Sequence, residues 1–395
     1  MKILKDLFDM VKLFFAYILV LSLYRKKVND SHWLICEKID EARDNGYHFF
    51  MYVRKNHPEI NIFYIMKKSS VDYQKIRKIG RIVEYGSLEH YVLYLTSSVL
   101  ISSQTMPYPC SRRVCELFSF FNVVKPKKVW LQHGITKDIL PNKGMDYRIF
   151  KYDILSCSSK YEKEFLQQEY GYPSNVTCLT GLCRYDNLYC DKLENQILIM
   201  PTFRSWLSPK NKSISNEEKK KFLKSEFYEQ YKGLLKSDEF NNLLIKNHYK
   251  AVFYLHYALQ PYTELFKKFE SKNVVIATSK DFDVQNLLKE SKLLITDYSS
   301  VFFDFAYMKK PEVFFQFDLS KYRLNHYKEG YFNYERNAFG DVCYSYDELM
   351  NSIRRRFATN MNISDDDSLK VDNFFEYNDC NNCKRTYDAI DKLLN

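Results

Sequence analysis

Histidines stand within two residues of the end of a short apolar run at two places in this sequence. His133 follows the run at 129–131, and His256 follows the run at 251–255. An imidazole titrates close to neutral pH, so a histidine held at the end of a strand can act as a general base. Gly134, next to His133, lets the backbone turn sharply and leaves the imidazole accessible. The sequence offers His133 as a base, with a structural histidine as the alternative, and His256 occupies the same kind of position.

Two arginines have similar settings. Arg184 lies in the segment 180–186, where Gly181 permits a tight turn, and Arg204 follows the apolar run at 197–200. A guanidinium group can bind a phosphate through two parallel hydrogen bonds. These positions therefore predict a phosphate-bearing ligand, and a surface Arg–Asp pair is the alternative for the segment that contains Arg184.

The segment 292–311 combines a strand, a polar turn and a helix. Its first part, 292–296, is a short apolar run with a β-branched end, which is typical of a buried strand. A helical pattern occupies 301–308, and the first turn of a helix offers free N–H groups to an anion. The segment predicts a phosphate site, with an ordinary capped helix as the alternative. The residues predicted to bind substrate here are Thr296, Asp297, Ser299 and Ser300.

Strand-like and helix-like segments alternate along the chain from His32 onward. The expected strands are 48–53, 60–66, 81–85, 98–102, 129–131, 154–157, 176–179, 197–200, 251–255, 274–277, 292–296 and 312–317. The expected helices include 71–79, 88–95, 161–170, 283–290 and 301–308. Such alternation predicts an α/β protein with parallel, doubly wound sheets, whose ligands bind at the carboxyl ends of the strands.

The alternation runs through two halves of the chain, which predicts two doubly wound domains. A chain of 395 residues is long enough to give each domain its own core. The expected divisions are a membrane-interface helix at 1–28, a first domain at 29–190, a second domain at 191–365, and a C-terminal helix at 366–395 that packs on the first domain.

The composition is that of a folded protein with an excess of positive charge. Hydrophobic residues make up 46% of the chain, and the formal net charge is +10. That charge suits an anionic substrate or membrane surface. Nucleic acid is disfavoured because Tyr and Phe recur at core spacing rather than among basic residues. The ten cysteines show no disulfide framework, which favours a reducing compartment. The Asp281–Asp283 pair is interpreted as a helix cap, so no metal site is expected.

The N-terminus predicts a helix that lies on a membrane surface. Its apolar run, 13–24, is shorter than the roughly 20 residues that a membrane span requires. Basic residues flank the run, and no cleavage site follows it. A helix in the headgroup region of the cytoplasmic leaflet fits this pattern, and a helix packed on the protein's own core is the alternative. The flanking basic residues are Lys2, Lys5, Lys12, Arg25, Lys26 and Lys27.

Five segments, taken in order, carry a family resemblance. They are LQHG at 131–134, TGLCRYDNL at 180–188, PTFRSW at 201–206, FYLH at 253–256 and TDYSS at 296–300. WLICEK and DNGYHFF, between Trp33 and Phe50, and DCNNCKR at 379–385 extend the likeness over nearly the whole chain. This ordered set resembles the CDP-glycerol glycerophosphotransferase family, whose members make teichoic acids and related capsule polymers.

The resemblance implies a GT-B-like fold of two Rossmann-like domains, with an acceptor domain first and a nucleotide-donor domain second. It implies an enzyme that moves glycerol phosphate from CDP-glycerol to a hydroxyl of a lipid-linked glycan or polymer and releases CMP. Such enzymes are peripheral on the cytoplasmic face of the membrane. No tightly bound cofactor is implied, and dependence on a divalent metal is left open.

The resemblance also implies roles for the strand-end residues. His133 would deprotonate the acceptor hydroxyl, and His256 would contact the donor pyrophosphate or assist the leaving group. Arg184 and Arg204 would neutralise phosphate charge. The chain departs from the family's His-Pro pair, because Tyr257 follows His256. The donor's phosphates or glycerol would be bound by Asp297, Ser299 and Ser300.

Three other functions remain compatible with the sequence. The donor could be CDP-ribitol, which would leave the chemistry unchanged. A glycosyltransferase that uses a nucleotide sugar would share the fold but release a nucleoside diphosphate. A membrane-tethered protein that binds nucleotides or polyanions would show no turnover.

Overall fold

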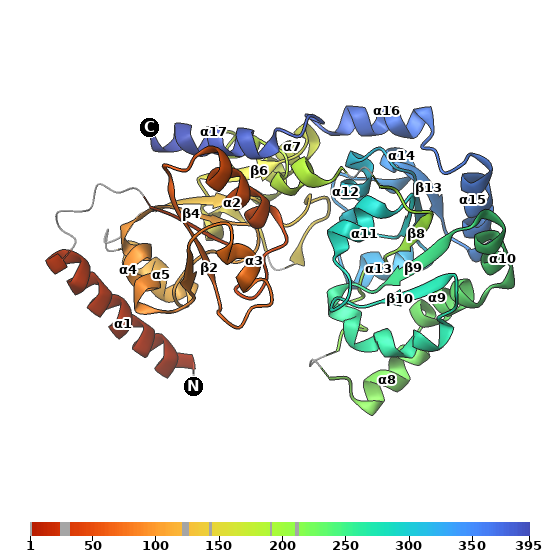
Figure 1. Ribbon diagram of the computed structural model, residues 1–395, viewed down its shortest axis with the longest axis horizontal. Helices are drawn as coiled ribbons and strands as arrows, with labels where there is room; N and C mark the ends of the chain where they lie inside the picture. Colours follow the sequence, from red (N-terminus) through yellow and green to blue (C-terminus); the bar gives the residue numbers. More distant parts are fainter. Residues whose placement is uncertain (1, 24–31, 121–125, 142–143, 190–191, 210–212) are drawn as a thin grey trace. The chain divides into compact units, whose positions relative to one another are not determined.

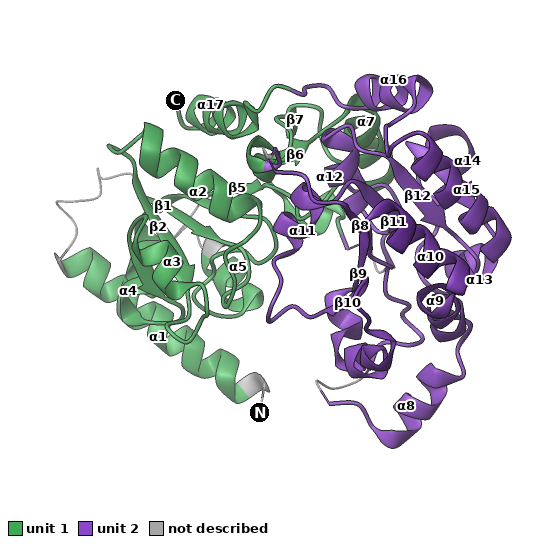
Figure 2. Cartoon of the chain, turned by 45° about the vertical axis from the view of Figure 1, so that its right-hand side comes forward, with its two compact units in different colours: residues 1–135, 145–187, 379–395 green, residues 136–144, 188–378 purple. Residues whose placement is uncertain are grey.

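The computed structural model describes residues 2–23, 32–120, 126–141, 144–189, 192–209 and 213–395, and Figure 1 labels many of their helices and strands. Two compact units make up the chain (Figure 2). Unit 1 comprises 1–135, 145–187 and 379–395, and unit 2 comprises 136–144 and 188–378. The C-terminal segment predicted at 366–395 is therefore divided, because its residues up to 378 belong to unit 2. Arg25, Lys26 and Lys27 lie outside the described residues.

Unit 1 is built on a parallel sheet. Within the described residues, its seven strands pair in the order β3-β2-β1-β4-β5-β6-β7. The strands are β1 (His32–Cys36), β2 (Asn61–Met66), β3 (Ile82–Glu84), β4 (Ser97–Ser102), β5 (Lys127–Trp130), β6 (Ile154–Cys157) and β7 (Thr177–Leu179). The helices are α1 (Lys2–Leu23), α2 (Asn45–Asn56), α3 (Tyr73–Arg77), α4 (Leu88–Thr96), α5 (Arg112–Phe120), α6 (Tyr147–Phe150), α7 (Lys160–Tyr170), η2 (Cys183–Asn187) and α17 (Asn382–Leu394).

Both faces of this sheet are buried, and β1 shows how. Successive side chains of a strand point to opposite faces. Trp33 and Ile35 join a core cluster that also contains residues of α2 and α17. Leu34 and Cys36 join a second cluster that contains residues of α1, α4 and α5. A strand that is covered on both faces has a continuous apolar run instead of an alternating one.

The segment 48–53 is a helix, so the prediction of a strand there was wrong. It lies inside α2, whose buried residues include Phe49, Phe50 and Val53. Their spacing of three to four positions is helical, but it was hidden inside a run of apolar letters. Gly46 allows this helix to approach β1, since a Cβ at this position would lie 2.8 Å from Glu37 Cγ. The prediction missed two of the described strands, 32–36 (β1) in this unit and 340–343 in unit 2.

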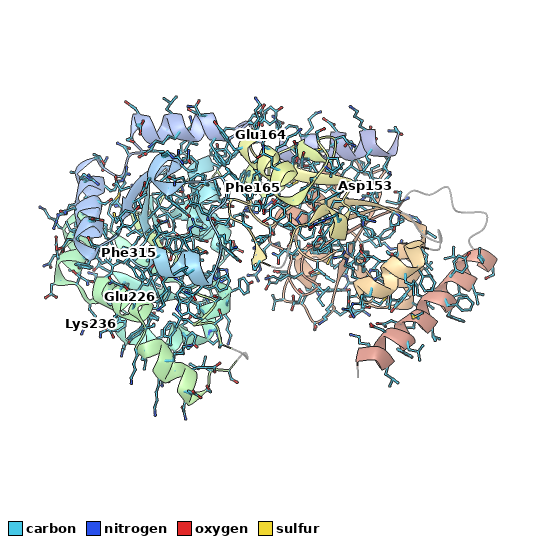
Figure 3. The ribbon with its side chains drawn as sticks, turned by 180° about the vertical axis from the view of Figure 1, so that it is seen from behind. Asp153, Glu164, Phe165, Glu226, Lys236 and Phe315 are labelled. Carbon is cyan, nitrogen blue, oxygen red and sulfur yellow. The ribbon has the colours of Figure 1, made fainter. Side chains whose placement is uncertain are left out.

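Unit 2 repeats the architecture with its own sheet. Its described strands pair in the order β10-β9-β8-β11-β12-β13. Phe315 is fully buried among the side chains of this core (Figure 3). The strands are β8 (Gln196–Ile199), β9 (Lys250–Tyr254), β10 (Val274–Ala277), β11 (Leu293–Thr296), β12 (Glu312–Phe315) and β13 (Gly340–Cys343). The helices are α8 (Asn216–Leu223), α9 (Glu226–Lys236), α10 (Asp238–Asn247), η3 (Tyr257–Leu265), η4 (Lys267–Phe269), α11 (Val284–Glu290), α12 (Val301–Tyr307), α13 (Leu319–Asn325), α14 (Tyr334–Asn337), α15 (Tyr346–Ala358) and α16 (Asp365–Phe374).

Helix α1 has one face against unit 1 and another in solvent. Leu13 and Ala16 are fully buried, and Asp9 accepts a hydrogen bond from the Tyr91 hydroxyl of α4 at 3.1 Å. The predicted alternative, a helix packed on its own core, is thus confirmed for this face. None of the described helices combines the length and the hydropathy needed to cross a bilayer. The exposed apolar residues of α1 are Leu4, Leu7, Phe8, Val11, Phe14, Phe15, Ile18 and Leu21.

Candidate active site

Each sheet reverses its strand order at one point, and polar segments gather there. In unit 1 the order reverses between β1 and β4, and in unit 2 it reverses between β8 and β11. Doubly wound sheets bind ligands outside the carboxyl ends of the strands at this reversal. The segment 132–134 follows β5, which pairs with β4. The segments 201–204 and 297–300 follow β8 and β11, so most of the predicted site residues lie at these two edges.

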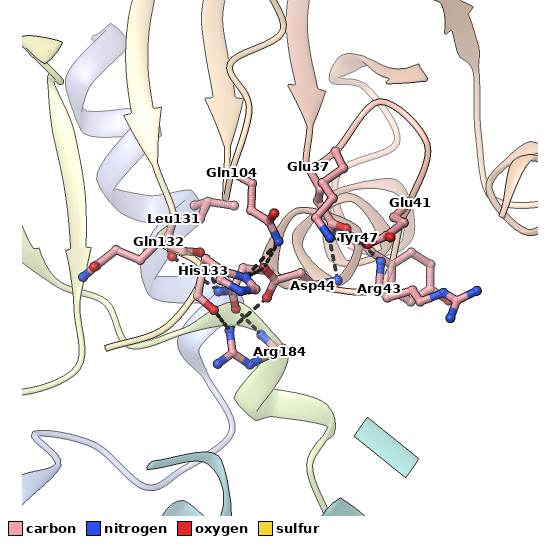
Figure 4. Close-up of polar contacts among 12 residues, drawn as sticks. Glu37, Glu41, Arg43, Asp44, Tyr47, Gln104, Leu131, Gln132, His133 and Arg184 are labelled. Atoms are coloured by element: carbon pink, nitrogen blue, oxygen red, sulfur yellow. Dashed lines mark hydrogen bonds and ion pairs between the residues drawn. The ribbon is translucent and has the colours of Figure 1, made fainter. Parts of the chain in front are cut away.

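His133 forms a hydrogen-bonded pair with Asp44 in unit 1 (Figure 4). The His133 side chain is 63% exposed, and its Nδ1 lies 2.7 Å from Asp44 Oδ2. Because an ionised carboxylate only accepts hydrogen bonds, Nδ1 must carry the proton, and Nε2 is then the basic nitrogen. In this arrangement a carboxylate orients a histidine base and stabilises its protonated form.

Arg184 completes this site from the turn after β7. Its Nη1 donates to Asp44 Oδ1 at 2.9 Å and to the carbonyl oxygen of His133 at 2.8 Å. Burial opposes ionisation of Asp44, but the charges of His133 and Arg184 outweigh burial and hold the pKa of Asp44 well below its usual range. The carboxylate is therefore charged at neutral pH.

The turn that carries Arg184 is held by α17. Gly181 has a φ of +73°, and a Cβ there would overlap the side chain of Asn382. The carboxylate of Asp186 accepts hydrogen bonds from the backbone N–H groups of Asn382 and Cys383, both at 2.8 Å. The alternative of a surface Arg–Asp pair in this segment was thus wrong. Arg184 forms an ion pair with Asp44, whereas Asp186 accepts hydrogen bonds from the start of α17.

Three residues of this site were not identified as functional from the sequence: Asp44, Glu37 and Gln104. Glu37 is buried after β1 and accepts from the N–H groups of Arg43 and Asp44 at 2.8 and 2.9 Å, which fixes the loop before α2. Burial, and then the charge of Asp44, raise the pKa of Glu37 to about 8. Gln104 Nε2 lies 2.9 Å from His133 Nδ1. Glu37 and Asp44 fall in WLICEK and DNGYHFF, the signal that could have revealed them.

In unit 2, Arg204 is fully buried between two carboxylates. Its Nη2 lies 2.9 Å from Asp297 Oδ2, and its Nε donates to Asp318 Oδ2 at 2.7 Å. Tyr298 and Tyr322 lie over the guanidinium group. Burial opposes the charge of Arg204, but the two aspartates outweigh burial and raise its pKa further. This geometry corrects the expectation of a direct phosphate contact, since Arg204 instead ties together the segments that follow β8, β11 and β12.

The predicted phosphate residues after β11 divide into buried and accessible members. Thr296 and Asp297 are fully buried. The Thr296 hydroxyl donates to a backbone carbonyl, and Asp297 Oδ1 accepts from a backbone N–H, at 2.7 and 2.8 Å, both at the end of β8. Ser299 and Ser300 are partly exposed before α12. The two serines can reach a ligand, whereas Thr296 and Asp297 lock the two strand ends together.

His256 caps the start of η3 and stacks on Phe203. The two ring centroids are 4.7 Å apart, and His256 Nδ1 accepts from the N–H of Ala258 at 3.3 Å. Nε2 then carries the proton in the neutral ring and can donate to an anion. His326 contacts the same Phe203 at 4.5 Å. Burial, and then the charge of Arg204, lower the pKa of His326 to about 4. Sequence reasoning did not connect His326 with this site because His326 follows a helix, α13, and not a strand.

The Asp281–Asp283 pair caps a helix, as predicted. The carboxylate of Asp283 accepts from the N–H of Asn286 at 3.1 Å at the start of α11. Across the described ranges, no three His, Cys, Asp or Glu side chains are grouped so that they could hold a metal ion.

Comparison with known sequences identifies the family. A family model described as CDP-Glycerol:Poly(glycerophosphate) glycerophosphotransferase matches residues 17–392. The minor teichoic acid biosynthesis protein GgaB of Bacillus subtilis (strain 168) is 32% identical over 369 residues, which are 92% of this chain and 40% of GgaB. The teichoic acid glycerol-phosphate primase of the same strain is 28% identical over 264 residues, which are 62% of this chain and 58% of the primase. The chain therefore spans less than half the length of GgaB.

Comparison with solved structures identifies the fold. The wall teichoic acid polymerase TagF, in a structure soaked with CDPG, has a TM-score of 0.66 at 18% identity, with 98% of each chain covered. The predicted architecture of two parallel α/β units is confirmed by this likeness and by the strand order. Because the family model matches residues 17–392 of this chain, the chain belongs to the CDP-glycerol:poly(glycerophosphate) glycerophosphotransferase family.

Proposed function

We propose that this chain transfers glycerol phosphate from CDP-glycerol to a hydroxyl of a membrane-linked glycan or glycerol phosphate polymer. The observation that carries the proposal is the pair of His133 and Asp44, which leaves an exposed imidazole with a basic Nε2. Transfer to an alcohol needs a base for the attacking hydroxyl, and membership of the family supplies the donor class.

In the proposed reaction, His133 Nε2 accepts the proton of the acceptor hydroxyl while the hydroxyl oxygen attacks the phosphorus that bears glycerol. The bond from that phosphorus to the oxygen of CMP breaks as the new bond forms, so CMP leaves with its electron pair. Asp44 stabilises the imidazolium, and Arg184 holds Asp44 in place. Gly134 keeps space beside the base for the acceptor.

We assign the donor phosphates to residues of unit 2. His256 can donate from Nε2, and the hydroxyls of Ser299 and Ser300 are accessible at the end of β11. Arg204 and Asp297 act as positioning residues, because they fix the loops that carry these groups without reaching solvent themselves. Preorganised donors of this kind stabilise charge that develops on the leaving phosphate.

The proposal is tested by the products released from CDP-glycerol. We expect CMP release that depends on a glycerol phosphate or lipid-linked glycan acceptor, with the phosphate retained in the product. CMP from CDP-ribitol alone would reassign the donor. A nucleoside diphosphate released from a nucleotide sugar would make the chain a glycosyltransferase, and nucleotide binding without any turnover would make it a binding protein.

We infer that the exposed face of α1 rests on the cytoplasmic membrane surface. Its large apolar side chains lie on one side of the helix, and Lys5 and Lys12 can meet anionic headgroups. Removing the helix would expose core residues that Leu13 and Ala16 cover, so substitutions on the outer face make the cleaner test.

The triple variant Phe8→Glu, Phe14→Glu and Ile18→Glu should lose most binding to phosphatidylglycerol vesicles in a sedimentation assay. Three charges would have to enter the headgroup region, where each costs free energy. The matched control places glutamate at exposed apolar positions elsewhere, Val71, Leu324 and Leu369. Equal sedimentation of the α1 variant and the wild type would contradict the inference.

A further inference from the structure

A cavity of about 250 Å³ lies in unit 1 next to the His133 site. Its aromatic lining includes Trp130, which is the last residue of β5. It also includes Phe150, the last residue of α6, and Tyr152, which lies just after that helix. Gln104, from the segment after β4, also lines it. The cavity thus opens at the carboxyl edge of the sheet, and it is smaller than the roughly 300–1,000 Å³ typical of drug-sized ligands. It has room for one small ring.

The aromatic rings that line the cavity stack on one another. Trp130 and Tyr152 stack with centroids 5.1 Å apart and planes inclined by 12°, and Phe150 stacks on the same tyrosine at 5.6 Å. Arg112 lies over Phe150 at 4.5 Å, and its Nε donates to Glu116 at 2.7 Å. The cation that lines the cavity is therefore already paired with a carboxylate.

The loops around the cavity are fixed by buried hydrogen bonds. His90 is fully buried and accepts at Nδ1 from the N–H of Gly86 at 3.1 Å, and its Nε2 lies 3.1 Å from the carbonyl oxygen of Pro107. The Ser102 hydroxyl oxygen accepts from the N–H of Gln104 at 3.0 Å. These bonds hold the segments after β3 and β4 in place, so the cavity does not need a ligand in order to form.

Gln104 connects the cavity to the catalytic pair. Its Nε2 lies 2.9 Å from His133 Nδ1 and donates to Asp44 Oδ2 at 3.4 Å. A ligand that fills the cavity therefore touches a side chain that itself touches both the base and its carboxylate. That position suits the part of the acceptor that carries the attacking hydroxyl.

We propose that this cavity binds a pyranose ring of the acceptor, stacked on the aromatic wall that contains Trp130 and Phe150. The inference rests on the proposed function and names its acceptor class. A pyranose has an apolar face of C–H groups and a rim of hydroxyls, which match the aromatic side chains of the lining and the amide of Gln104. A glycerol phosphate unit would bring an anion to a site whose cation, Arg112, is already neutralised by Glu116.

Saturation-transfer NMR on the full chain, with methyl glycosides of hexoses and N-acetylhexosamines as probes, tests this assignment. We expect transfer to the ring C–H protons in the wild type. In Trp130→Leu and Phe150→Leu, the same glycosides should bind about tenfold more weakly, because the stacking surface is lost while an apolar side chain remains. Tyr161→Leu, which removes an exposed aromatic ring on α7 outside the cavity, should bind like the wild type.

Absence of transfer for every glycoside, or wild-type binding by both cavity variants, would overturn the inference. Far-ultraviolet circular dichroism of each variant checks that the loss is local. The assay needs no CDP-glycerol, so it is independent of turnover. Glycoside binding without CMP release would contradict the proposed function and leave the cavity assignment standing. CMP release without glycoside binding would support the proposed function and contradict the cavity assignment.

Discussion

Replacing His133 with alanine should lower acceptor-dependent CMP release by at least about 10²-fold, and as much as 10⁴-fold. The variant loses the only side chain proposed to take the proton from the attacking hydroxyl. Asp44→Asn should also lower the rate, because an amide can donate to Nδ1 and so favours the tautomer in which Nε2 carries the proton. CMP release is measured with CDP-glycerol saturating, so that a loss of donor binding does not imitate a loss of the base.

His248→Asn is the matched control. His248 is exposed in unit 2 and has a φ of +58°, a conformation that asparagine also adopts readily. Its activity should equal that of the wild type. If His133→Ala keeps more than a tenth of the wild-type rate while remaining folded, His133 is not the base, and the proposed proton transfer fails.

Arg204→Met should destabilise unit 2 by roughly 3–5 kcal/mol, because it leaves Asp297 and Asp318 buried without their cation. Methionine preserves the volume and flexibility of the stem, so the loss reports on charge instead of packing. Hydrogen exchange in peptides from β8 and β11 measures the change, since it resolves the stability of one unit within the chain.

Two further variants separate the loss of the buried ion pairs from the loss of an arginine in general. Arg148→Met removes an arginine of unit 1 whose side chain is 77% exposed and pairs with Asp146 at the surface, and exchange should stay close to that of the wild type because solvent screens this ion pair. Adding Asp297→Asn and Asp318→Asn to Arg204→Met should recover part of the stability, because no charge is then left unpaired. Equal exchange in Arg204→Met and the wild type would contradict a structural role for this ion cluster.

The architecture was predictable because parallel strands have short apolar runs and polar ends. Apart from 48–53, the expected strands coincide with observed ones to within a few residues. The exception is instructive, because HFFMYV in α2 is as apolar as the buried strands, and only the spacing of its buried positions is helical. Runs this short do not distinguish a buried strand from the buried face of a helix.

The positions of the site residues were predictable, but their partners were not. The sequence correctly placed His133 and Arg204 after the ends of strands, with Arg204 following β8 at one reversal of strand order and His133 following β5, one strand away from the other. The partners come from remote segments: Asp44 lies 89 positions from His133, and Asp318 lies 114 positions from Arg204. No local pattern encodes such pairs, so the sequence could not reveal that the guanidinium of Arg184 pairs with Asp44 beside His133, whereas that of Arg204 is buried in a core.

The way α17 clamps the turn of Arg184 affects the order of events during translation. Unit 1 needs residues 379–395, and these leave the ribosome only after the whole of unit 2 has been made. Until then Asp186 lacks the N–H groups of Asn382 and Cys383, and the turn that delivers the arginine to Asp44 is not braced. A nascent chain therefore braces the turn that holds Arg184 against Asp44 only after unit 2 has been synthesised.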